Sequence, residues 1–253
     1  MKRRRAPSRL LWLLLASSTL TVMAGAIIGP VVKQIGTGLN VDDSSAGLII
    51  TMHGVFVFLL SPVAGALIDR FGARRPLFYG LLLYGLSGGA GLVIDSYALL
   101  LIARAFLGIA VALIFTSVTV IILDLYEGSR RNRIMGLRAS ANSLGAALWP
   151  LLGGALGVVS WQLPFAVYLV GVPLGLLTLV YMPEMKKGTG DAEGSLRSSV
   201  RSRPVLFAIY ATMLVTMLLL YVNVIYIPQI LTAAGIPSPL YVRTFLAAMA
   251  LAA

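Results

Sequence analysis

Cysteine is absent from the 253 residues, and histidine occurs only once, at His53. The lack of cysteine excludes a disulfide framework, a thiolate metal site and a cysteine nucleophile. The sequence also lacks a phosphate-binding glycine loop with lysine, a cluster of metal ligands and a Ser/His/Asp set. We therefore expect no enzymatic activity, no metal and no cofactor.

Charged residues are scarce as well, at 11% of the chain, whereas 58% of the residues are hydrophobic and the mean hydropathy is +0.92. Soluble domains carry about 25% charged residues. A soluble fold of this length could not bury so much apolar surface, so the composition indicates an integral membrane protein in contact with the lipid bilayer. A polytopic membrane enzyme would need polar catalytic clusters at a membrane face, and the sequence has none.

Apolar runs of about 20 residues, the length that crosses a bilayer, recur along the chain. They cover residues 10–32, 46–68, 76–94, 98–123, 134–159, 163–182 and 204–231. The first run passes the small residues Ala24-Gly25-Ala26 and continues to Val32, which favours an uncleaved helix over a signal peptide. An eighth run begins near Leu240 and reaches Ala253 after about 21 Å of helix, short of the ~30 Å hydrocarbon core. We expect an all-α membrane protein truncated in helix eight, either a fragment or a truncated gene product, with the remainder of its C-terminal half missing.

The net charge of +11 would suggest a nucleic-acid partner in a soluble protein, but here its distribution follows the expected membrane. Sixteen of the 20 basic residues lie before residue 10 or in the segments 70–75, 130–133 and 186–203, all on one side of the expected bilayer. Basic loops mark the cytoplasmic side. We therefore expect a cytoplasmic N-terminus, a multi-pass protein of the plasma (inner) membrane, and no nucleic-acid binding.

A polar segment rich in glycine, serine and charge separates the sixth run from the seventh. It predicts a cytoplasmic linker at 183–203 between a six-helix half at 1–182 and the first two helices of a second half at 204–253. Transporters often use such a layout, in which each half consists of inverted three-helix repeats.

The loop between the second and third spans carries four charged residues within seven positions. Its sequence resembles the signature loop of the major facilitator superfamily, with matching residues Gly65, Asp69, Arg70, Gly72, Arg74 and Arg75. The spacing also has a physical reading: Gly65 allows a close helix neighbour, and Gly72 permits a tight reversal. The resemblance implies a charge network that latches the two halves on the cytoplasmic side, and Asp124 is a further member through pairing with Arg74 or Arg75. An ordinary basic loop is the alternative.

Two further motifs resemble elements of this superfamily. Arg104 and Gly108 match an Arg-x-x-x-Gly element of helix four associated with substrate or proton coupling, although Leu107 replaces a frequent glutamine. The fifth span resembles the antiporter motif G-x-x-x-G-P-x-x-G-G of drug–proton exchangers, with matches at Gly145, Pro150, Gly153 and Gly154. Trp149 stands where a glycine is expected, so we expect it to prevent close packing there. The alternatives are a structurally paired arginine and a generic kinked helix.

Ionisable and polar residues inside the spans are functional candidates. His53 and Asn223 fall in this class as groups for proton coupling or a substrate cavity, and packing or helix–helix hydrogen bonding is the alternative for each. No aspartate or glutamate lies deep in a span, so a proton carrier would be His53, Asp69 relayed to Arg104, or a residue of the missing half. The resemblance implies a secondary transporter that moves a small molecule by alternating access, most simply by proton-coupled efflux. Uptake or symport of a small organic solute, or an inactive truncated product, are the alternatives.

Overall fold

The computed structural model describes residues 8–182 together with 211, 212 and 215. The chain divides into two compact units, Met1–Thr189 and Gly190–Ala253, and the helices described below lie in the first. The predicted linker, Asn223 and the eighth span lie outside the described residues, as does the seventh span apart from three positions. The boundaries of the two halves therefore stay a prediction.

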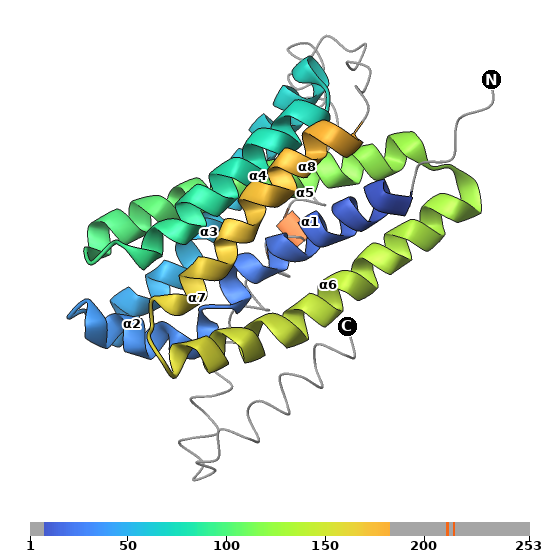
Figure 1. Cartoon of the computed structure of the whole chain (residues 1–253). Coiled ribbons are helices and arrows are strands. Elements are labelled where there is room, and N and C mark those ends of the chain that lie inside the picture. Colours follow the sequence, from blue (N-terminus) through green and yellow to red (C-terminus); the bar gives the residue numbers. More distant parts are fainter. Residues whose placement is uncertain (1–7, 183–210, 213–214, 216–253) are drawn as a thin grey trace. The chain divides into compact units, whose positions relative to one another are not determined.

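The described part of the first unit is helical throughout and contains no strand (Figure 1). Its α-helices are α1 (Ser8–Ala26), α2 (Val32–Gly38), α3 (Asp43–Phe71), α4 (Arg74–Gly89), α5 (Tyr97–Leu125), α6 (Gly128–Gly157), α7 (Leu163–Ala166) and α8 (Gly171–Tyr181). Three 3₁₀ turns join them: η1 (Gly29–Val31), η2 (Ala90–Leu92) and η3 (Val167–Val170). Each of the six spans predicted before residue 183 falls on these helices, so the predicted all-α fold class is confirmed.

Four helical segments of this part are long and apolar enough to cross a membrane: Ser8–Gly38, Asp43–Phe71, Tyr97–Leu125 and Leu163–Tyr181. The other two predicted spans correspond to α4 and α6, which pack against α5 and α1 respectively. α4 has 16 residues and is therefore only about 24 Å long. α6 begins with a strongly basic stretch, which lowers its hydropathy although its second half is apolar.

Two sequence signals fix the ends of α3. Asp42 caps its N-terminus by accepting hydrogen bonds from the amides of Ser44 and Ser45, at 3.1 and 3.2 Å, and from the Ser45 hydroxyl at 2.6 Å. The Ser45 hydroxyl bond, with the amide bonds, holds the pKa of Asp42 below its usual value. At the other end Gly72 has φ 76°, a backbone conformation that favours glycine, and this residue turns the chain into α4.

The first span is broken, which the sequence analysis did not predict. α1 ends at Ala26, and the chain passes through η1 before it continues as α2. Pro30 has no amide hydrogen, so it cannot bond the carbonyl of Ala26 four residues earlier. The Met23 carbonyl still accepts from the Ile27 amide at 3.2 Å. The carbonyls that follow it, including that of Ala24, have no such donor because the helix ends at Ala26.

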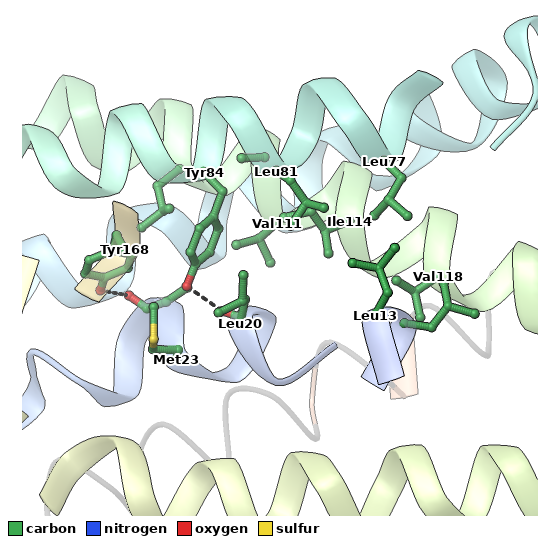
Figure 2. Close-up of a cluster of buried hydrophobic side chains, with 14 of the residues drawn as sticks. Leu13, Leu20, Met23, Leu77, Leu81, Tyr84, Val111, Ile114, Val118 and Tyr168 are labelled. Atoms are coloured by element: carbon green, nitrogen blue, oxygen red, sulfur yellow. Dashed lines mark hydrogen bonds between the residues drawn. The ribbon is translucent and has the colours of Figure 1, made fainter. Parts of the chain in front are cut away.

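A hydrophobic core surrounds α1 on the side of α4 and α5. Leu20, Met23, Leu81 and Ile114 are essentially inaccessible and pack together with Tyr84 (Figure 2). The opposite face of α5 is apolar too, but it is exposed: Leu99, Ile102 and Phe106 are about half accessible. A helix that is apolar on both faces suits a protein whose outer surface meets lipid rather than water.

Candidate functional site

A buried arginine lies where five helical elements meet. Arg104 is the eighth residue of α5, about 10 Å from the start of that helix, and its side chain is completely inaccessible. Its Nη1 donates to the hydroxyl of Tyr168 at 3.1 Å and to the carbonyl of Ala24 at 3.5 Å. The Tyr168 hydroxyl itself donates to the same carbonyl at 2.7 Å. Arg104 and Tyr168 together therefore bond the end of α1 that the break leaves without donors.

Aromatic rings hold the guanidinium of Arg104 on its remaining sides. Its Cζ lies 4.8 Å from the ring centroid of Phe165 and 5.0 Å from that of Tyr168. Tyr84 packs 5.5 Å from Tyr168 and donates its own hydroxyl to the carbonyl of Leu20 at 2.6 Å (Figure 2). The carbonyl end of α1 carries a partial negative charge. The dipole of α1 and the faces of the aromatic rings thus stabilise the guanidinium of Arg104, since no carboxylate of residues 8–182 does so.

This stabilisation is incomplete. Nε and Nη2 of Arg104 are buried and have no hydrogen-bond partner among the described residues. The aspartates and glutamates of residues 8–182 all lie at helix ends or in connections: Asp42, Asp43, Asp69, Asp95, Asp124 and Glu127. Buried donors without partners are costly, and such groups concentrate at functional positions.

His53 belongs to the same cluster. It is 7% exposed in the middle of α3, and its imidazole is close enough to Arg104 for the two charges to interact. Its Nδ1 is buried without a partner in the described bundle. Gly108 explains how α3 comes so near to α5, because a Cβ at this position would collide with the carbonyl oxygen of His53 and the Cβ of Phe56. The predicted coupling residues Arg104, Gly108 and His53 are therefore brought together.

The signature loop lies at the opposite end of α3. Asp69 and Arg75 are exposed, and Asp69 makes no hydrogen bond or ion pair with the described residues. Arg70 has its guanidinium 5.4 Å from the ring of Phe71. No atom of the described bundle lies within 4 Å of a Cβ built on Gly65. The expected close helix neighbour of Gly65 is thus not found among residues 8–182.

Arg74 has a partner that the sequence analysis did not predict. Its Nη2 donates to the carbonyl of Leu179 at 2.7 Å, near the end of α8. This atom thus bonds one of the last carbonyls of α8 rather than a carboxylate. Arg74 consequently ties the start of α4 to the end of α8 within the bundle.

The antiporter-like motif of α6 faces the broken part of the first span. A Cβ on Gly153 would collide with the backbone carbonyl of Ile27, and one on Gly157 would collide with Val31. Gly154 has more room, with Pro30 at 3.6 Å from its built Cβ. Gly153 and Gly157 therefore let α6 pack directly on the end of α1 and on η1.

The Trp149 ring leaves the contacts of Gly153 and Gly157 with the broken part of the first span in place. Its indole Nε1 lies 2.9 Å from a Cβ built on Gly145, one turn earlier in α6. The ring thus folds back along its own helix over Gly145 and away from the glycines that meet η1. The expected effect of Trp149 on close packing at its own position stays a prediction.

A second buried arginine is a site residue that the sequence analysis missed. Arg138 of α6 is 5% exposed, and its Nε donates to the Ser18 hydroxyl at 2.8 Å. Its Nη1 donates to the Thr119 hydroxyl at 2.7 Å, and Ser18 donates to Oδ1 of Asn142 at 2.9 Å. The sequence places Arg138 inside the fifth span, and that position within an apolar run is the signal that could have identified it.

Comparisons with known proteins agree with this architecture. Residues 14–253 match the Major Facilitator Superfamily. The chain is 30% identical to "Multidrug resistance protein 1" of Bacillus subtilis (strain 168) over 67% of its own length and 44% of that protein. It is 32% identical to the "Bacillibactin exporter" of the same organism, over 56% of this chain and 37% of that protein. For "Quinolone resistance protein NorA" of Staphylococcus aureus (strain COL) the identity is 26%, over 64% and 42%.

Solved structures support the fold. The crystal structure of peptide transporter POT in complex with sulfate aligns with a TM-score of 0.62 and 22% identity, over 85% of this chain and 46% of that one. The chain spans about half the length of the relatives it matches. The match over nearly the whole sequence shows that this multi-pass membrane protein belongs to the Major Facilitator Superfamily.

Proposed function

We propose that the protein works as a secondary active transporter that exports a small molecule in exchange for protons by alternating access. Family membership supports a transporter, and the relatives described above are named for multidrug resistance, quinolone resistance and export. The buried arginines Arg104 and Arg138 lie inside the helix bundle, where a transported solute would pass.

The observation that carries the proposal is the cluster of Arg104, His53 and Tyr168 at the break of α1. Transporters commonly coordinate cations at the carbonyl ends of interrupted helices. Here Arg104 and Tyr168 bond the carbonyl of Ala24 while His53, which can exchange a proton, lies within reach of the charge on Arg104. A proton gained or lost by His53 changes the electrostatic balance at this carbonyl end and so biases the position of α2 beyond the break.

The signature loop fits the role of a latch in this cycle. Asp69 is exposed and has no partner in the described bundle, so its carboxylate is available to a group outside residues 8–182. A pair that forms in one conformer and is lost in the other sets the populations of the two states. We assign Asp69, with Arg70 and Arg75 beside it, to holding the outward-facing state, and Gly72 to shaping the turn that presents them. Asp124 remains a candidate member of this network.

The close packing of α6 on η1 gives the antiporter-like motif of α6 a part in the same process. Because Gly153 meets the backbone of Ile27, a displacement at the break of α1 is transmitted to α6 rather than absorbed by side chains. Pro150 lies within α6 three residues before this contact and removes one helical hydrogen bond.

We place the N-terminus in the cytoplasm and the protein in the plasma membrane, because the basic loops lie on one side of the expected bilayer.

Substitution of Arg104 tests this function. In cells loaded with a fluorescent aromatic substrate, Arg104→Lys keeps the charge but cannot span the two rings and the carbonyl of Ala24 as a planar guanidinium does. We expect export to fall by about tenfold or more, with the amount of protein in the membrane unchanged. Arg133→Lys, on the exposed start of α6, is the matched control and should export at the normal rate. Normal export by Arg104→Lys would contradict the role of this cluster.

A further inference from the structure

A groove of about 580 Å³ runs along α6 and reaches Thr19 of α1. It is lined by apolar groups, among them Ala141, Leu144, Leu148 and Trp149, together with Thr19 of α1. Leu144 and Leu148 are each 59% exposed, so the groove is open on one side. Binding sites for small organic molecules have this character: concave, mainly apolar and supplied with a few polar groups.

Polar residues that do not themselves line the groove lie close to its lining residues in sequence. Arg138 precedes Ala141 by three residues, about 4.5 Å along the axis of α6, and Ser18 directly precedes Thr19. The two helices that line the groove therefore also carry the hydrogen-bonded network of Arg138, Ser18 and Asn142. A molecule whose apolar part occupied the groove would have its end next to this network.

The network holds a positive charge that is not neutralised. Arg138 is held by neutral oxygens of Ser18, Thr119 and Phe115, the last a carbonyl at 3.4 Å, and by the ring of Phe115, whose centroid lies 4.7 Å from Cζ. No carboxylate of residues 8–182 contacts it. A guanidinium inside an apolar bundle is costly without a countercharge, and an anion would form charge-assisted, bidentate bonds with it.

Access to the guanidinium depends on Phe115. This side chain is 50% exposed and lies over Arg138, so a change of its rotamer would uncover the guanidinium. Thr119 is also partly accessible and can exchange its bond with Arg138 for one to a ligand. The described lining contains no acidic residue that would favour an organic cation.

We propose that the groove binds an amphipathic organic anion, with its aromatic or aliphatic body along α6 and its carboxylate or sulfonate at Arg138. The inference rests on the transport function proposed above and gives that function a substrate class. A ligand of this kind supplies the countercharge that residues 8–182 lack and covers the exposed leucines of α6.

Binding of three molecules with the same body and different heads tests this charge preference directly. Naphthoate, naphthamide and naphthylmethylammonium carry a negative, a neutral and a positive head on one apolar ring system. The full chain in lipid nanodiscs is equilibrated with each by dialysis, and binding to empty nanodiscs is subtracted. We expect naphthoate to bind at least about tenfold more tightly than naphthamide, because a hydrogen-bonded charge pair is gained, and naphthylmethylammonium to bind most weakly.

Substitutions of single residues test whether Arg138 causes the preference for naphthoate. Arg138→Gln should reduce the affinity for naphthoate to that for naphthamide and leave naphthamide unchanged. Arg133→Gln removes the same charge from the exposed start of the same helix and should change neither. Ala141→Phe fills the groove and should weaken all three probes. If Arg138→Gln fails to fold, Arg138→Lys keeps the charge without the bidentate geometry and should lose most of the advantage of naphthoate.

Each outcome decides the inference independently of transport. Equal binding of the three probes, tighter binding of the cation, or binding of none of them would overturn it; the last result would mean that another part of the protein covers the groove. A naphthoate preference that persists in Arg138→Gln would place the anion elsewhere and overturn it as well. Naphthoate binding without export would leave the inference intact and contradict the proposed function. Proton-coupled export without a charge preference in binding would support the proposed function and overturn the inference.

Discussion

Tyr168 donates its hydroxyl to the carbonyl of Ala24 at 2.7 Å, at the turn where α1 stops. The two residues are 144 positions apart, so this bond joins the first span to the sixth. Arg104 adds a weaker contact to the same oxygen. The break in the first span is thus stabilised by groups from α5 and η3.

Removal of the Tyr168 hydroxyl tests the importance of this bond. Tyr168→Phe leaves the Ala24 carbonyl with only the long contact from Arg104 and takes one partner from the guanidinium. We expect a loss of about 1 to 3 kcal/mol in the free energy of unfolding, the cost of buried polar groups left without partners. Thermal unfolding of the purified protein in detergent measures the difference.

Tyr84→Phe is the matched control for that experiment. Tyr84 also donates to a carbonyl of α1, that of Leu20, but Leu20 lies inside the helix and its carbonyl also faces the amide of Ala24. The loss should therefore be smaller, about 0.5 to 1.5 kcal/mol. An equal loss in both variants would show that the end of α1 has no special dependence on Tyr168.

Neighbouring glycines of α6 should respond differently to alanine. Gly153→Ala places a methyl group against the backbone of Ile27, which cannot move aside without shifting η1. We expect a destabilisation of about 1 to 3 kcal/mol from overpacking and reduced export. Gly154→Ala meets only Pro30 at an ordinary contact distance and should be neutral or slightly stabilising. The order of the two melting temperatures checks this prediction, and the reverse order would contradict the close contact between α6 and η1.

The exposed Asp69 should affect transport without affecting stability. Asp69→Asn removes a charge that has no partner among residues 8–182, so we expect the stability to change by less than about 0.5 kcal/mol. Transport should slow, because the outward-facing state loses its stabilising pair. Accessibility of a cysteine at the exposed position of Leu144, introduced into the naturally cysteine-free chain, reports the shift in population.

Arg74→Gln provides the contrasting result in the same loop. It removes the bond to the Leu179 carbonyl and should destabilise the bundle by about 1 kcal/mol. If Asp69→Asn lowered the stability as much as Arg74→Gln, Asp69 would have a structural role within its own half, and the latch would be refuted.

The membrane topology can be read with a single label. Gly190→Cys introduces one thiol into the predicted linker, which the basic loops place in the cytoplasm. We expect a membrane-impermeant maleimide to react with it in broken cells and not in intact ones. Reaction in intact cells would show that the linker lies outside the cell and that the orientation is the opposite of the predicted one.

Much of the fold could be predicted from the sequence, because apolar length and basic loops report directly on spans. The six spans before residue 183 and the turn at Gly72 follow from such local signals. The break of the first span was missed even though Pro30 is visible, since a proline can also be accommodated as a kink, as Pro150 is in α6. The residues around a proline do not reveal whether it will break a helix or only kink it.

Prediction of the site was less complete, for a physical reason. Arg104, Gly108 and His53 were each identified as single residues, but their meeting depends on contacts between helices far apart in sequence. The position of the Trp149 ring over Gly145 likewise depends on a residue one turn earlier in α6. Arg138 was missed because it follows a basic loop, and only tertiary structure shows that its side chain turns inward to Ser18 and Thr119.

Proton movement measured together with substrate movement tests the central claim most directly. The purified protein is reconstituted in liposomes that contain a trapped pH-sensitive dye, and a substrate gradient is applied without any pH gradient. The account predicts that substrate flow in one direction drives protons in the other. Arg104→Lys should lower both flows by about tenfold or more, and Arg133→Lys should leave them unchanged. Substrate flow at an undiminished rate without any change in the internal pH would contradict proton exchange.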